Sequence, residues 1–132
     1  MTKLGAVVAA AVLVLSIAAP AQSAQRAWTF LGQRSVTDRA DHDVIPVTGD
    51  RGTFKQIKLS VQRASVDFRR VVVHYGNGGH EEIDIKSTIR AGGETRAINL
   101  NGEDRVIKSV EFWYDANTRR GRQAVVRLFG KD

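Results

Sequence analysis

The residues with the most potential chemistry form one short run, Asp38-Arg39-Ala40-Asp41-His42-Asp43. Carboxylates are preferred ligands of calcium and magnesium, and imidazole suits transition metals. The run therefore predicts a metal-binding protein or metal-dependent enzyme centred on Asp41, His42 and Asp43. The spacing fits neither the calcium loop D-x-[DN]-x-[DN]-G nor the zinc helix H-E-x-x-H. The competing interpretation is a solvated loop in which Asp41 or Asp43 accepts hydrogen bonds from local backbone N–H groups.

The other two histidines provide a second candidate. His80-Glu81-Glu82 follows a glycine-rich turn, and a site of two histidines and a carboxylate would form if the fold brought it near His42. His74 alternates with Val73 and Tyr75, so we expect it on the outer face of a strand as ordinary polar surface. The sequence holds no G-x-S-x-G elbow for a serine nucleophile. These residues favour a non-catalytic protein over an enzyme, and we expect no cofactor.

Three arginines, Arg119, Arg120 and Arg122, lie in the loop expected before the last strand. Planar guanidinium groups bind phosphate or sulfate through paired hydrogen bonds. The loop therefore predicts binding of an anionic polymer, against the simpler interpretation of a solvated hairpin tip. We do not expect nucleic acid as the partner, because the basic residues are not interleaved along the chain with an aromatic platform.

Trp113 is the aromatic residue of most interest. It alternates with Phe112 and Tyr114 and so points to the opposite face of its strand. An exposed tryptophan on a sheet face can stack on a sugar ring, which makes Trp113 a candidate for glycan binding. The favoured interpretation is burial under a loop or under the amino-terminal segment, where Trp28 would also pack.

The strands that must position these residues are visible as alternations of apolar and polar residues, in Ile57–Val61, Val71–Tyr75, Ile83–Ile85, Ile98–Leu100, Val110–Tyr114 and Ala124–Leu128. Turn signals rich in glycine, asparagine and aspartate separate them. About seven or eight strands at a spacing of about ten residues predict an all-β fold, an antiparallel β-sandwich of jelly-roll-like or Ig-like type. Pro46 is expected on an edge strand or at a strand end, because it lacks an N–H group.

The first residues have the pattern of an export signal. Lys3 gives a positive start, Leu4 to Ala19 contains no charged residue, and small residues follow as far as Ala24. This is the pattern of a secretory signal peptide over residues 1–24, with cleavage near residues 21–24. The apolar run is shorter than the roughly 20 residues that a membrane-spanning helix needs, so an uncleaved anchor is the less favoured alternative. We expect a periplasmic or secreted protein with no transmembrane segment after cleavage.

Residues 25–132 have the size of a single domain. The chain contains no cysteine, so this domain must be stabilised by its core without disulfides. The net charge is +6, which favours encounters with anionic partners. The first interpretation is a non-catalytic domain that binds an anionic or glycan component of the cell envelope. A protein–protein interaction module that pairs through an exposed strand edge is a further alternative.

Two segments carry a resemblance to a known family. They are Trp28-Thr29-Phe30-Leu31-Gly32 and the run from Gly52 to Leu59. Two further segments fit the same pattern, Arg105 to Phe112 and Ala124 to Gly130. The chain resembles a family of small exported bacterial proteins termed a domain of unknown function. The resemblance covers nearly all of the chain after the leader and implies the β fold and export. It implies no activity and no functional residue.

Overall fold

The computed structural model describes residues 27–36, 41–116 and 123–132. These residues contain no helix and nine strands: β1 (Thr29–Val36), β2 (Asp41–Pro46), β3 (Gln56–Gln62), β4 (Val66–Tyr75), β5 (His80–Ile83), β6 (Ser87–Ile89), β7 (Ile98–Asn99), β8 (Ile107–Ala116) and β9 (Ala124–Lys131). A search of the same residues for a helix that could cross a membrane finds none. The all-β prediction is confirmed, with one strand more than expected.

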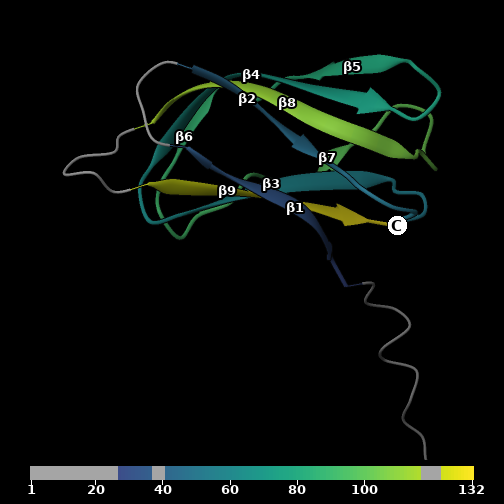
Figure 1. Cartoon of the computed structure of the whole chain (residues 1–132), viewed down its shortest axis with the longest axis horizontal. Coiled ribbons are helices and arrows are strands. Elements are labelled where there is room, and N and C mark those ends of the chain that lie inside the picture. The colour runs from purple at the N-terminus through teal and green to yellow at the C-terminus, as the bar shows by residue number, and fades with distance from the viewer. Residues whose placement is uncertain (1–26, 37–40, 117–122) are drawn as a thin grey trace, which may run out of the picture.

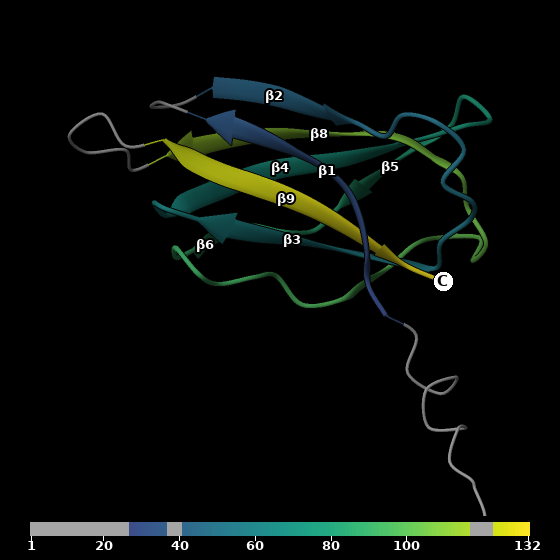
Figure 2. The ribbon, with the colours of Figure 1, turned by 60° about the horizontal axis from the view of Figure 1, so that its bottom comes forward.

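The strands form two sheets that lie face to face (Figures 1 and 2). The four-stranded sheet has the order β1-β9-β3-β7, and the five-stranded sheet has the order β2-β8-β4-β5, with β6 also paired to β4. Every pairing between these strands is antiparallel. The predicted antiparallel β-sandwich is therefore confirmed.

The burial of each long strand follows its sequence alternation. In β9, Val126 and Leu128 are fully buried, whereas Arg127 and Phe129, which alternate with them, are half-buried on the opposite face. In β8, Phe112 and Tyr114 face the interior and Glu111 and Trp113 face outward. Successive side chains of a strand point to opposite faces, so each sheet has an apolar inner face and a mixed outer face.

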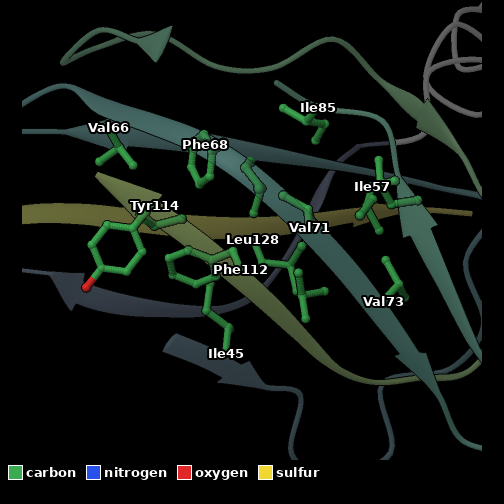
Figure 3. Packing of buried hydrophobic residues seen from close by; sticks show 14 of the residues in the cluster. Ile45, Ile57, Val66, Phe68, Val71, Val73, Ile85, Phe112, Tyr114 and Leu128 are labelled. Carbon is green, nitrogen blue, oxygen red and sulfur yellow. The ribbon is translucent and has the colours of Figure 1, made fainter. Parts of the chain in front are cut away.

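The two inner faces share one hydrophobic core (Figure 3). Aromatic rings fill one end of it, where the ring centroids of Phe68 and Phe112 lie 5.9 Å apart in an edge-to-face arrangement. Leu128 and Ile57 of the four-stranded sheet and Val71 of the five-stranded sheet are fully buried in the same core. Tyr114 places its ring in the core and donates its hydroxyl to Oδ2 of Asp43 at 2.7 Å.

Two local expectations have different outcomes. Pro46 is the last residue of β2, an edge strand, so its predicted position is confirmed. The expectation of one continuous strand over Ile83 and Ile85 is wrong, because β5 ends at Ile83 and pairing with β4 resumes only at Ser87. Ile85 is still buried, at 4% exposure. The break lies at the same place along β4 as a register shift in its pairing with β8, between Phe68 and Arg70.

Candidate functional site

The outer face of the four-stranded sheet carries a group of aromatic and basic side chains, which we call the aromatic–basic face: Trp28, Phe30, Lys58, Arg127, Phe129 and Lys131. Alternation in β9 directs Arg127, Phe129 and Lys131 outward, since Val126, Leu128 and Gly130 face the core. The strand register then places Phe129 opposite Phe30 of β1 on one side and Lys58 of β3 on the other.

The cations of this face lie over its aromatic rings. Nζ of Lys58 is 4.6 Å and Nζ of Lys131 is 5.6 Å from the ring centroid of Trp28. The guanidinium carbon of Arg127 is 4.9 Å from the ring centroid of Phe30. The rings of Phe30 and Phe129 meet edge to face, with centroids 5.7 Å apart. Cation–π contacts of this kind favour these positions of the charges on the sheet.

Sequence reasoning missed this face. It looked for basic and aromatic residues interleaved along the chain, whereas the interleaving arises across strands, from the pairing of Phe30, Phe129 and Lys58. One local signal was available, because Arg127, Phe129 and Lys131 alternate within a single strand. Phe30 is 39% exposed and is one of two large apolar residues exposed in the described part of the chain.

The outer face of the five-stranded sheet gathers the three histidines of the chain. Nε2 of His42 lies 2.5 Å from Oε2 of Glu111, and Nε2 of His74 lies 2.8 Å from Oε1 of the same carboxylate. An ionised carboxylate only accepts hydrogen bonds, so both imidazoles donate to it. His80 pairs with His74 across β4 and β5, and their ring centroids are 6.1 Å apart. The structure therefore joins His42 and His74 through Glu111, which sequence reasoning did not single out.

Glu111 is the electrostatic centre of this cluster. Hydrogen bonds from His74 and then from His42 hold the pKa of the Glu111 carboxyl below its usual range, because they favour the charged form. Beside it is a pocket of about 230 Å³, whose lining includes His74, Glu111, Lys108 and Ser109. Within the described ranges, no three His, Cys, Asp or Glu side chains are arranged so that they could hold a metal ion.

The structure places the side chains of the predicted metal residues on different faces of one strand. Asp41, His42 and Asp43 are consecutive in β2, so their side chains alternate between its two faces. His42 points outward to Glu111, whereas Asp43 accepts hydrogen bonds from the Tyr114 hydroxyl and from Nε of Arg34. Oδ1 of Asp41 accepts a hydrogen bond from the backbone N–H of His42 at 2.8 Å, as the local-backbone interpretation expects.

Trp113 is half-buried on the outer face of β8, where its neighbours cover it. His42 of β2 stacks on the indole with a centroid separation of 4.7 Å and an angle of 27° between the ring planes. From β4 on the other side, the guanidinium carbon of Arg70 lies 4.6 Å from the ring centroid. Trp28, which was expected to pack beside it, instead lies on the outer face of the other sheet, next to Lys58. A sugar would have to displace His42 or Arg70 to stack on Trp113.

The remaining candidate residues cannot be placed. Arg119, Arg120 and Arg122, together with the proposed leader over residues 1–24, lie outside the described residues. The predictions made for them therefore stay predictions.

The fold and its two outer faces define a small all-β sandwich with an aromatic–basic surface. The model of a family described as a domain of unknown function (DUF2541) matches residues 7–130, and the chain belongs to that family. This confirms the resemblance seen in the sequence. No curated protein is similar enough to this chain to count as a relative.

Among solved structures, the chain is similar to Pseudomonas aeruginosa AlgX, with a TM-score of 0.45 and 14% sequence identity. The matched region covers 94% of this chain and 33% of the AlgX chain. The chain thus spans about a third of the length of that protein.

Proposed function

We propose that this protein is an exported, non-catalytic domain that binds an anionic glycan of the cell envelope on its aromatic–basic face. The observation that carries the proposal is the placement of three cations over three aromatic rings on one sheet face. Cations recognise the acidic groups of such a polymer. The side chain of Phe30, which is 39% exposed, provides apolar area for contact with its sugars. Cations and rings bind a glycan but supply no nucleophile, so the proposed role is binding.

The fixed geometry of the face supports binding of a long, flexible ligand. Arg127 and Phe129 belong to β9, which is hydrogen-bonded on both sides, to β1 and to β3. A binding surface on a rigid sheet loses little conformational entropy when its ligand arrives. Lys58 and Lys131 are restrained by the Trp28 ring. Such pre-positioned charges make a stronger contribution than charges on unrestrained side chains.

A pair of double variants tests the proposal. Arg127→Gln with Lys131→Gln removes two charges from the aromatic–basic face, and Arg69→Gln with Lys108→Gln removes two from the other sheet. The probe is polygalacturonate, titrated by calorimetry at low salt and again at high salt. We expect the first variant to weaken binding by about tenfold or more, because two charge-assisted contacts are lost. The control variant is expected to stay within about twofold of wild type.

Further arms separate the ligand classes. Phe30→Ala is expected to weaken binding of polygalacturonate by a factor that high salt does not change, since the lost contact is apolar. Neutral dextran is expected not to bind. The proposal is overturned if wild type does not bind polygalacturonate, or if both double variants lose affinity equally. Tighter binding of single-stranded oligothymidylate than of polygalacturonate would replace it with a nucleic-acid function.

A further inference from the structure

Lys58 is a cation of the aromatic–basic face that is largely withdrawn from water. Its side chain is only 16% exposed, although it ends in an ammonium group. The ring of Trp28 lies 4.6 Å from Nζ, and the ring of Phe129 lies 5.7 Å away on the neighbouring strand. Withdrawing a charge from water is costly unless the charge is paired. An anion beside Lys58 therefore offsets this cost.

Glu94 supplies that anion. Both of its carboxylate oxygens lie 3.2 Å from Nζ of Lys58. Glu94 comes from the segment between β6 and β7, where a single bridge joins it to Ser60 of β3. Its own side chain is 54% exposed, far more than that of Lys58. The carboxylate can therefore rotate into solvent, whereas the ammonium is held between two rings.

We propose that the Glu94 carboxylate occupies an anion subsite on Lys58, and that an acidic group of the bound glycan takes this subsite by displacing Glu94. This inference rests on the proposed function of the same face. The exchange replaces one carboxylate by another and leaves Lys58 paired throughout. Glu94 then acts as an internal competitor that weakens binding of the glycan.

Competition between Glu94 and acidic sugars for Lys58 determines which class of ligand binds. An isolated acidic sugar must displace a carboxylate that is tethered to the same protein, and the tether gives Glu94 a high effective concentration at Lys58. A polymer that also contacts Arg127 and Lys131 has a tether of its own, because each bound sugar holds the next one near the face. The exchange at Lys58 therefore favours a polyanionic chain over free monosaccharide acids.

Glu94→Gln tests the inference against a matched control. Glu82→Gln makes the same change in net charge on the other sheet, where Glu82 pairs with Arg70 at 3.2 Å. Polygalacturonate is titrated into the full chain at low salt. We expect Glu94→Gln to bind about threefold more tightly than Glu82→Gln, the size of effect that an exposed ion pair supports. Adding Lys58→Gln to Glu94→Gln is expected to abolish that gain, because the subsite itself is then lost.

The outcomes separate this inference from the function beneath it. If wild type binds polygalacturonate but Glu94→Gln and Glu82→Gln bind equally, Glu94 is no competitor and the inference is overturned while the proposed function stands. If the gain of Glu94→Gln persists without Lys58, the effect is one of general charge and the inference is again overturned. If wild type and all variants fail to bind polygalacturonate, the inference and the proposed function are both overturned. Thermal unfolding of each variant confirms that the compared proteins are folded.

Discussion

A single carboxylate can hold three strands together through its side-chain contacts. Glu111 of β8 accepts hydrogen bonds from His42 of the edge strand β2 and from His74 of β4. These strands already share backbone hydrogen bonds, so the side chains add a second layer of cross-links on the outer face. Because the cross-links favour the ionised carboxyl, the pKa of Glu111 is lowered, and the stability of the fold becomes linked to pH.

The sign of this linkage gives the first prediction. The pKa of Glu111 is lowered from 4.5, so the group stabilises the folded state above about that pH and stops doing so as pH falls through its lower folded value. We expect Glu111→Gln to lower the urea midpoint at about pH 7 and to make the loss of stability below about pH 4.5 shallower than in wild type. Urea unfolding at several pH values measures both effects. An acid limb as steep in Glu111→Gln as in wild type would contradict this role. Glu82→Gln, on the same face, is the control.

At the scale of elements, Gly130 of β9 is the point where three segments pack closely. Leu31 of the edge strand β1 and Phe54 of the loop before β3 both lie against it. A Cβ atom at Gly130 would lie 2.7 Å from Cδ1 of Phe54 and 2.9 Å from Cδ1 of Leu31. Both neighbours are buried, at 3% and 2% exposure, so neither has room to withdraw. The absence of a side chain at this position therefore allows the sheet and the core to pack closely.

The second prediction follows from that contact. We expect Gly130→Ala to lower the free energy of unfolding by about 1–3 kcal/mol, the usual cost of overpacking a core. Gly79→Ala is the matched control, because its Cβ would meet only the exposed side chain of Asn77, with Oδ1 at 3.1 Å. That oxygen accepts a hydrogen bond from the Gly79 N–H, and a shift of a few tenths of an ångström relieves the contact. Equilibrium urea unfolding compares the two. Equal stabilities of the two variants would show that Phe54 and Leu31 yield to the methyl group.

Period-two alternation predicted the strands around Leu59, Val73, Phe112 and Val126, because inward and outward residues differ in type within each strand. The candidate sites were harder to predict, because they depend on which strands lie side by side. His42 meets Trp113 only because β2 pairs with β8. Strand order depends on the whole core, so no local pattern encodes it.

At the scale of the whole molecule, the sandwich presents two chemically different outer faces. One carries aromatic rings and cations, including Phe30 and Arg127, and the other carries the histidines joined by Glu111. Their separation by the core means that charge variants on one face leave contacts on the other intact. Effects of variants at such distant sites are expected to add. This is why Glu82→Gln serves as a control for Glu94→Gln.

The third prediction concerns where the protein acts. A positive start, an apolar run and small residues up to Ala24 are the basis for expecting export. We expect the chain, expressed in a bacterium with an envelope, to be recovered outside the cytoplasm with its amino terminus between Gln22 and Gln25. Intact-mass spectrometry of the fractions measures this. Leu13→Arg with Leu15→Arg is expected to leave full-length precursor inside the cell, because two charges interrupt the apolar run that export requires.

The matched control is Leu13→Ile with Leu15→Ile, which keeps the run apolar and is expected to be processed like wild type. A full-length chain found in the membrane fraction would instead identify the first residues as an uncleaved anchor. The two results have different consequences for ligand binding. A cleaved domain meets soluble and wall-bound glycans alike, whereas an anchored one meets only polymers that reach the membrane surface. The mass and fraction of the recovered protein would therefore show which polymers the aromatic–basic face can reach.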